Sequence, residues 1–220
     1  MQITWLGHAA FLIETDTAEG KVSIITDPYS SRSGYDPIHE TADVVTLSHE
    51  NPKYHSCLEE LHGEPQIVRG LEIVNRVVTT RSLRIGAVPV FENEQGEGPN
   101  TMIWLESEGM RVLHMGDVGH PLSDPHVIAC GQVHVLLAPT GGPPTIQLTH
   151  LKDFIERLRP LLIIPMHYGT AKVDMQILPV EEFTRLFPPQ QVEQSDSATI
   201  AVGRHNLPGQ PTVQVLQHAR

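Results

Sequence analysis

Cysteine is scarce in this 220-residue sequence, which contains only Cys57 and Cys130. The two residues are far apart and form no CxxC pair, which argues against a disulfide framework and against a thiolate zinc site. We expect both to be small core residues, because free cysteine is often buried. No apolar run approaches the roughly 18 residues that a membrane-spanning helix needs, so we expect no membrane partner.

Basic side chains are also few: 15 lysines and arginines stand against 26 aspartates and glutamates, and the formal charge is -11. That charge has the wrong sign for holding a nucleic-acid backbone or an anionic membrane by electrostatics alone. The sequence therefore predicts no nucleic-acid partner. The first residues, MQITWLGHAAFLIET, lack the basic segment of a signal peptide. From these absences we expect a cytoplasmic protein.

The chain is instead rich in short apolar runs of strand-like composition. Strands come first, helices intervene and strands close the chain, which favours an α+β fold of two mixed β-sheets packed face to face and flanked by helices over a doubly wound parallel sheet. The length fits a single domain over residues 1–220. The predicted strands lie at 3–6, 10–14, 22–26, 44–47, 66–68, 73–79, 83–90, 101–106, 111–114, 133–138, 161–165, 199–202 and 212–215, and the predicted helices at 148–158 and 180–186.

Five of these runs end in a histidine or an aspartate. Strands that end in loops at one edge of a sheet could bring such side chains together. Imidazoles and carboxylates are typical metal ligands. The sequence therefore predicts a metal site. The runs are ITWLGH at His8, VSIITD at Asp27, VVTLSH at His49, RVLHMGD at His114 and Asp117, and LIIPMH at His167.

Several motifs resemble those of the metallo-beta-lactamase-fold hydrolases, and in particular the branch of predicted zinc-dependent hydrolases that includes the ascorbate-6-phosphate lactonase. The likeness covers roughly residues 1–202 and implies a four-layer αβ/βα sandwich with metal ions at the sheet edge. The motifs are WLGHAAFLIE (5–14), TDP (26–28), GPNT (98–101), HMGD (114–117), PTGGPPT (139–145) and PMHYGT (165–170).

The defining HxHxDH signature of that family is altered in the matching stretch, residues 49–54. Only its first histidine, His49, is present. Asn51, Lys53 and Tyr54 stand at the positions of the second histidine, the aspartate and the last histidine. By resemblance, His114 would complete a first metal site, Asp117 would bridge two ions and His167 would belong to the second.

The changed ligands bear on how many ions can bind. Zinc needs at least three good protein ligands, and an amide oxygen such as that of Asn51 is weak and suits harder ions. His49, His114 and Asp117 could hold one ion with Asn51 or water, whereas a second ion would have only Asp117 and His167. We therefore expect one divalent ion, zinc, manganese or nickel, or none.

Lys53 and His55 offer two ways to compensate for the lost ligands. An ammonium group at Lys53 would repel a second ion and could replace its charge beside Asp117, where it would also attract an anionic substrate; the alternative is a lysine in solvent. A shift of one residue in the loop could bring His55 to the place that Tyr54 vacates, although exposed loop histidines are common.

Three further residues have two interpretations each. His8 either orients a ligand or substrate or is a core histidine bonded to a carbonyl. Asp27, which we place with Tyr54 around the ligands, either accepts a bond from a ligating imidazole or caps a turn. Glu92 either carries a proton, if burial raises its pKa, or is a solvated loop residue.

Two functions follow from these patterns. The first is a metal-dependent hydrolase of a small molecule, a lactone, an ester or a phosphorylated ester, in which Asp117, His8 and Lys53 act on water and substrate. The alternative is a family member without the chemistry that serves as a small-molecule binding or interaction module, because three of the four signature ligands are replaced. A nuclease has support from the fold family alone. A homo-oligomer is also compatible with the sequence.

Overall fold

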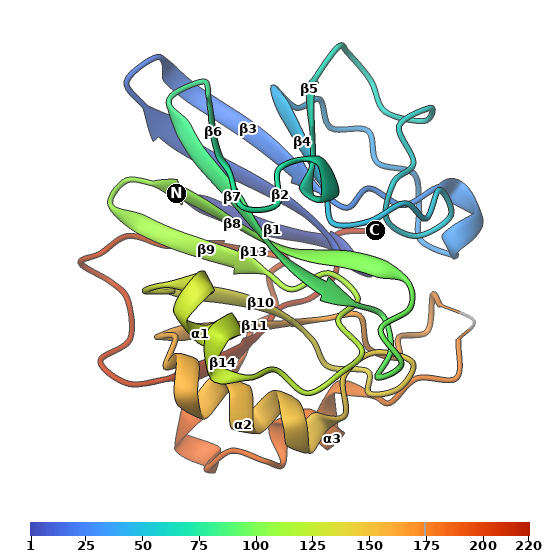
Figure 1. Ribbon diagram of the computed structural model, residues 1–220, viewed down its shortest axis with the longest axis vertical. Coiled ribbons are helices and arrows are strands. Elements are labelled where there is room, and N and C mark those ends of the chain that lie inside the picture. Colours follow the sequence, from blue (N-terminus) through green and yellow to red (C-terminus); the bar gives the residue numbers. More distant parts are fainter. Residues whose placement is uncertain (174) are drawn as a thin grey trace.

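The computed structural model describes residues 1–173 and 175–220 as two facing β-sheets, with α-helices against the outer side of one sheet (Figure 1). The strands are β1 (Gln2–Gly7), β2 (Ala10–Thr17), β3 (Gly20–Thr26), β4 (Val44–Leu47), β5 (Gln66–Arg69), β6 (Val77–Thr80), β7 (Leu83–Phe91), β8 (Pro99–Ser107), β9 (Met110–His114), β10 (Val135–Pro139), β11 (Leu162–Met166), β12 (Val192–Gln194), β13 (Thr199–Ala201) and β14 (Thr212–Val215). The helices are α1 (Asp124–Cys130), α2 (Leu148–Leu158) and α3 (Val180–Thr184), with 3-10 turns η1 (Ser31–Ser33), η2 (Gly70–Glu72) and η3 (Pro189–Gln191).

Both sheets mix parallel and antiparallel neighbours. One has six strands in the order β13-β1-β2-β3-β4-β5, and the other has eight in the order β12-β14-β11-β10-β9-β8-β7-β6. In the six-stranded sheet, β13-β1-β2-β3 are antiparallel and β3-β4-β5 are parallel. In the eight-stranded sheet, β6-β7-β8-β9 are antiparallel and β9-β10-β11-β14 are parallel. The predicted α+β fold of two mixed sheets is therefore confirmed.

The six-stranded sheet is buried on both faces because its strands are apolar on both. Successive side chains of a strand point to opposite sides. Ile24 and Val44 lie in the main core, which also contains residues of the eight-stranded sheet, whereas Ile25 and Val45 lie in a second cluster on the outer face. Tyr29 is part of that second cluster, so loop side chains cover this outer face where helices cover the other sheet.

The centre of the eight-stranded sheet is formed by β10 and β11, in which every residue is buried. These strands are parallel, with Val135 opposite Leu162, and their uninterrupted apolar sequences are typical of strands covered on both faces. The connection between them is α2, which buries Phe154 and Leu151 completely. Figure 1 shows α1, α2 and α3 together on this side of the molecule.

Several elements differ from the predicted ones. Helix α1 was not predicted, although its signals are present: Ser123 and His126 form a capping box, and Pro125 occupies the first turn. Strand β12 was not predicted, α3 ends before the predicted residue 186, and the predicted strand at 73–79 is shorter, since β6 begins only at Val77. These are short elements whose pattern spans too few residues to register clearly in a sequence.

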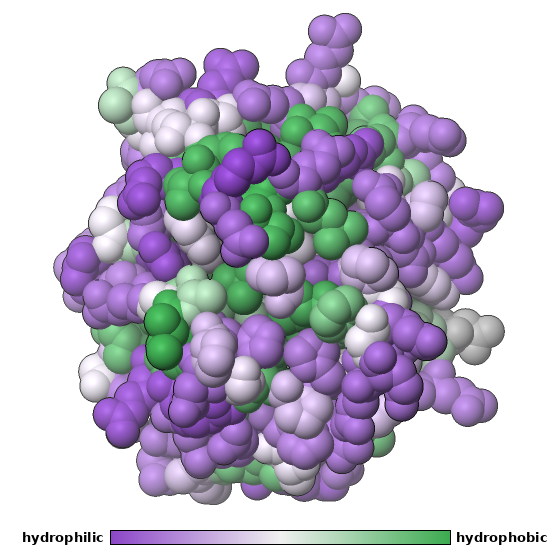
Figure 2. Space-filling model, in the orientation of Figure 1, coloured by the Kyte–Doolittle hydropathy of each residue, from purple (hydrophilic) through white to green (hydrophobic). Residues whose placement is uncertain are grey.

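The face shown in Figure 2 is mostly hydrophilic, with apolar side chains gathered in its upper half and centre. Large apolar residues that are exposed include Ile128 on α1, at 78%, and Val77 in β6, at 50%. In the described part of the chain, none of the helices has the length and apolarity that crossing a bilayer requires.

We expect the Phe154→Ala variant to lose about 3–5 kcal/mol of unfolding free energy, because a fully buried ring is replaced by a cavity between α2 and the sheet. Chemical denaturation measures the loss. The control is Ile128→Ala, which removes an exposed side chain and should change the free energy by no more than about 0.5 kcal/mol. Similar losses in the two variants would contradict the position of α2.

Candidate metal centre

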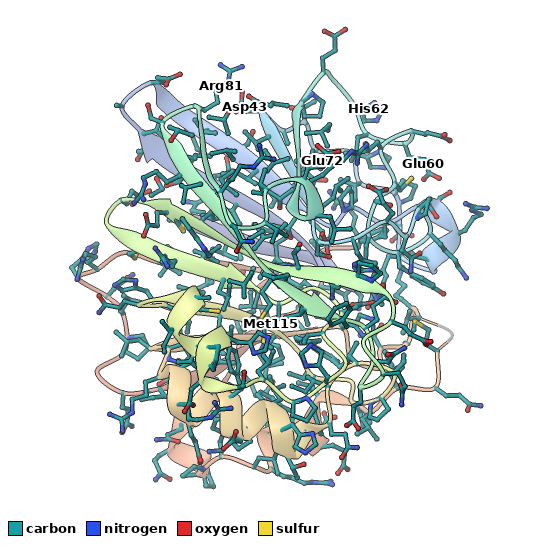
Figure 3. All side chains as sticks on the ribbon, viewed as in Figure 1. Asp43, Glu60, His62, Glu72, Arg81 and Met115 are labelled. Carbon is teal, nitrogen blue, oxygen red and sulfur yellow. The ribbon has the colours of Figure 1, made fainter. Side chains whose placement is uncertain are left out.

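Five strand ends deliver polar side chains to one region, close to Met115, which follows β9 and is labelled in Figure 3. The backbone at three of these ends is left-handed, with φ of 48° at His8, 37° at Asp27 and 50° at His167. Such values are uncommon outside glycine and recur at functional sites. The residues at the strand ends are His8 after β1, Asp27 after β3, His49 after β4, His114 at the end of β9 with Asp117 beyond it, and His167 after β11.

Asp117 is the carboxylate around which the imidazoles gather. Its Oδ2 lies 3.0 Å from His55 Nε2 and 3.9 Å from His49 Nε2, and its Oδ1 lies 3.4 Å from His167 Nε2. Burial alone would raise the pKa of Asp117, but the rings of His55 and His167 hold it well below its usual value. Asp117 is therefore negatively charged at neutral pH.

Asp27 fixes the tautomer of His49 through Ser48. The Ser48 hydroxyl donates to Asp27 Oδ2 at 2.5 Å, so its single hydrogen is used. The 2.9 Å contact between this hydroxyl and His49 Nδ1 must then be a bond donated by the imidazole. Burial and the nearby His55 lower the pKa of His49 to about 4, which keeps the ring neutral. Its Nε2, facing Asp117, therefore has a free lone pair.

His55 is fully buried and lies between the two carboxylates. Its Nδ1 is 3.2 Å from Asp27 Oδ2, and its Nε2 is 3.0 Å from Asp117 Oδ2 without the alignment of a hydrogen bond. Burial opposes a charge on this ring, but Asp117 and Asp27 outweigh it and raise the pKa of His55 to about 10. The predicted alternative, in which a shifted loop turns His55 into the site, matches this position.

The turn that carries His55 into the cluster is shaped by Asn51. The Asn51 carbonyl accepts backbone N–H groups from Tyr54 at 3.1 Å, His55 at 2.8 Å and Ser56 at 3.0 Å. The side-chain Oδ1 of Asn51 accepts a further bond from Tyr54 N at 3.3 Å. The structure thus uses Asn51 to form the loop, and its role as a metal ligand stays a prediction that this arrangement does not favour.

Lys53 and Tyr54 lie on the outer side of the cluster. The Tyr54 ring is centred 5.0 Å from the ring of His8, and Lys53 Nζ lies 4.7 Å from the centre of the Tyr54 ring. Lys53 is exposed, and the cationic group that contacts Asp117 is His55. The hypothesis that Lys53 neutralises Asp117 is therefore replaced by one in which His55 does so, because the turn at Asn51 brings that ring inward.

The structure does not bring His114 into the ligand cluster. Its Nδ1 accepts a bond from Gly116 N at 3.1 Å, so the proton is on Nε2, which donates to Ala9 O at 2.8 Å. Both ring nitrogens are thus committed to backbone groups. In this arrangement His114 joins the end of β9 to the residue before β2, so the expected ligand set of His49, His114 and Asp117 stays a prediction that the structure does not favour.

Glu92 follows β7 and reaches the open side of the cluster. Its Oε1 lies 3.8 Å from His49 Nε2, and its side chain is 42% exposed. Its backbone is closely confined, since a Cβ on Gly119 would lie 1.7 Å from Glu92 O. Burial and the nearby Asp117 raise the pKa of Glu92. The loop residue therefore faces the site, as the proton-carrier interpretation requires.

The donor set fits a divalent metal ion. Buried polar atoms without partners normally cost about 1–3 kcal/mol each, so a group of them points to a ligand. Donors at 2.0–2.2 Å from a four-coordinate ion are separated by about 3.3–3.6 Å, and the Asp117 oxygens lie 3.0, 3.4 and 3.9 Å from three ring nitrogens, on both sides of that range. Ligand atoms within 4.8 Å of one another occur in two groups, His8 with His55 and His167, and Asp27 with His49 and His55. The atoms of this region without a hydrogen-bond partner are Nδ1 and Nε2 of His8, Nε2 of His49, Nε2 of His55, Oδ1 of Asp117 and Nδ1 of His167.

The chain is similar to several known proteins over most of its length. Residues 2–167 match the family model described as the beta-lactamase superfamily domain. A UPF0173 protein of Pyrococcus abyssi is 30% identical over 185 residues, which cover 77% of this chain and 84% of that protein. A UPF0173 metal-dependent hydrolase of Archaeoglobus fulgidus is 27% identical over 205 residues, again covering 77% and 84%.

A solved structure agrees with these matches. The crystal structure of a candidate zinc-dependent hydrolase of the metallo-beta-lactamase superfamily from Thermotoga maritima has a TM-score of 0.79 and 32% sequence identity. The match covers 98% of this chain and 97% of that one. The fold expected from the motifs is therefore confirmed.

Gly116 determines the backbone that presents Asp117. Its φ is +58°, and a Cβ there would lie 2.7 Å from Asn100 Oδ1 and 2.8 Å from Ser48 Cβ. We expect Gly116→Ala to cost about 1–3 kcal/mol more unfolding free energy than Gly96→Ala, because Gly96 shares a positive φ but has nothing within 4 Å. Urea denaturation compares the two variants. Equal losses would show that the crowding at Gly116 does not exist.

Proposed function

The chain belongs to the beta-lactamase superfamily, and within it to the UPF0173 family, and from this premise we propose that it is a metal-dependent hydrolase of a small molecule with one well-formed metal site. The observation that carries the proposal is that His49 Nε2 and His55 Nε2 lie 3.9 and 3.0 Å from the same oxygen, Asp117 Oδ2. An ion bound there would take the place of the proton on His55 Nε2, while His55 Nδ1 keeps its contact with Asp27. Three protein ligands with an open position are typical of catalytic metal sites.

The proposed ion is zinc, manganese or nickel, since imidazole and carboxylate donors suit all three. A second ion lacks ligands, because Lys53 and Tyr54 occupy the positions where the family signature has an aspartate and a histidine. His167 and Asp117 Oδ1 are the remaining donors on that side.

An ion at this site supplies a Lewis acid that activates water near neutral pH and polarises the scissile bond. Side chains of the protein transfer the protons and orient the attacking group. Glu92 faces His49 from the open side, and its raised pKa suits a carboxylate that accepts a proton and returns it to the leaving group. Asp117, ionised and held between His55 and His167, orients the attacking group.

His8 and His167 form the wall next to this cluster. Their ring centres are 4.1 Å apart, and both His8 nitrogens are buried without a partner. The pKa of His8 is lowered well below its usual value by burial and by His167, so the ring is neutral and can donate one hydrogen bond and accept another. We assign to His8 the positioning of a polar substrate group.

The substrate that we propose is a lactone, an ester or a phosphorylated ester with an anionic part. Lys53 is exposed over the outer face of Tyr54, next to His8, and its ammonium group can attract an anion toward the site. The nearer likeness to the branch with the ascorbate-6-phosphate lactonase stays a prediction and places phosphorylated lactones among the first substrates to try.

Metal analysis tests the ligand set. After purification without chelator, we expect about one ion per chain in the natural protein and a loss of most of it in His55→Ala, because one of three ligands is removed. The control is His39→Ala, an exposed histidine outside the cluster. A natural protein without metal, whose thermal stability does not respond to added metal, would favour the alternative of a binding module. Full metal retention in His55→Ala would contradict the assigned ligand.

Kinetics test the role of Glu92. With a substrate from a panel of lactones, esters and phosphate esters, Glu92→Gln should lower kcat by about 10²- to 10⁴-fold, as expected for loss of a proton carrier. Its metal content should be unchanged, because Glu92 is not one of the three proposed ligands. Glu94→Gln, an exposed carboxylate of the same loop, is the matched control. Equal rates in both variants would remove Glu92 from the reaction.

A further inference from the structure

A cavity of about 410 Å³, lined by charged residues, lies at the end of β9 that is farther from the metal centre. Arg111, which lines it, is at the other end of β9 from His114, about 10 Å away at 3.3 Å per residue. Figure 1 shows the turn between β8 and β9 at the left, and the loop after β7, which carries Glu92, at the right. The cavity is therefore separate from the site described above. The residues that line it are Ser82, Arg84, Glu106, Ser107, Gly109, Met110, Arg111, Gln132, His134 and Arg204.

The charged groups of this cavity are mostly basic, in a chain whose formal charge is -11. Three arginines, Arg84, Arg111 and Arg204, face one carboxylate, Glu106. The formal charge of the lining is therefore +3 - 1 = +2. A region of this sign attracts anions, and a phosphate dianion would balance it.

Arg111 serves to build the cavity. Its Nε donates to Glu106 Oε1 at 3.0 Å and its Nη2 to the same oxygen at 2.6 Å, while its Nη1 bonds to Cys130 O. The guanidinium also stacks 4.1 Å from the ring centre of Trp104. With these contacts Arg111 has little capacity left for a ligand, and it fixes Glu106 in the wall.

Arg84 and Arg204 keep donors available. Arg84 is 57% exposed and, among residues 1–173 and 175–220, bonds through Nη1 alone, to Glu106. Within the same residues Arg204 bonds only through Nη1, which donates to Gly109 O at 2.9 Å. The remaining N–H groups of both guanidinium forks have the geometry that suits bidentate binding of a phosphate or carboxylate.

His134 adds a buried donor without a partner. It is 7% exposed, and its Nδ1 accepts a bond from Arg111 N at 3.0 Å, so the ring proton is on Nε2. This Nε2–H has no hydrogen-bond partner among the described residues. Burial, then Arg204 and Arg111, lower the pKa of His134, so the ring is a neutral donor. A buried N–H without an acceptor, next to free guanidinium groups, is satisfied by an anion.

We propose that this cavity binds a phosphate group, either inorganic phosphate or the phosphate of a small phosphorylated molecule, through Arg84, Arg204 and His134. Its volume falls in the range of small-molecule sites, about 300–1,000 Å³, and leaves room for an organic part beside the phosphate. This proposal does not depend on the metal-dependent activity.

Calorimetry on chelator-treated protein tests the site, because removing metal prevents phosphate from binding through an ion. We expect inorganic phosphate to bind saturably, with one site per chain, and Arg204→Gln to weaken it by about tenfold or more through loss of a charge-assisted bond. Arg185→Gln, which changes an exposed arginine just after α3 that is paired with Glu182, should leave the affinity unchanged. The ring ¹⁵N resonances of His134 should shift on titration.

Two further arms complete the experiment. Glycerol phosphate binding more tightly than inorganic phosphate would identify a phosphorylated molecule as the ligand, and equal affinities would identify the anion itself; either outcome supports the site. A loss of binding in His55→Ala but not in Arg204→Gln would put the phosphate at the metal centre and overturn the proposal. So would the absence of saturable binding, or equal weakening by Arg204→Gln and Arg185→Gln.

Discussion

Two carboxylates surrounded by imidazoles, that of the buried Asp27 and that of the partly buried Asp117, are the constraint on which the site depends. A buried charge is costly unless it is paired and hydrogen-bonded. Asp27 accepts bonds from Ser48 N and from the Ser48 hydroxyl, and Asp117 has His55 and His167 beside it. His55 contacts both carboxylates, one from each sheet, and thus joins the two sheets at the edge where their loops meet.

The loop after β4 shows how one tight turn decides which side chains reach the cluster. The Asn51 carbonyl accepts hydrogen bonds from three backbone N–H groups. The turn that results buries His55, while Tyr54 and Lys53 lie outside it. The backbone at Asn51 therefore determines that His55 lies beside Asp117 and Asp27.

The two ends of strand β9 in the eight-stranded sheet suit ions of opposite charge. At the end of β9 near His114, carboxylates and imidazoles suit a cation. At its beginning, near Arg111, guanidinium groups and a neutral imidazole donor suit an anion. A net charge of -11 describes neither region, because local composition and burial, and not the total, decide which ions each attracts.

The sequence by itself determined the two mixed sheets, since short apolar runs with period two specify strands without reference to the rest of the chain. It also determined that His8, Asp27, His49, Asp117 and His167 stand at strand ends, where one sheet edge can gather them. Only the tertiary structure decided which ring nitrogens are free. The proton on His49 is set by Ser48 and Asp27, and both nitrogens of His114 are taken by Ala9 and Gly116. The bonds from Ser48 to His49 and from Gly116 to His114 are local, but each ring also depends on a partner far along the chain. Ser48 bonds to Asp27, 21 positions away, and His114 bonds to Ala9, 105 positions away, and no local pattern encodes these contacts.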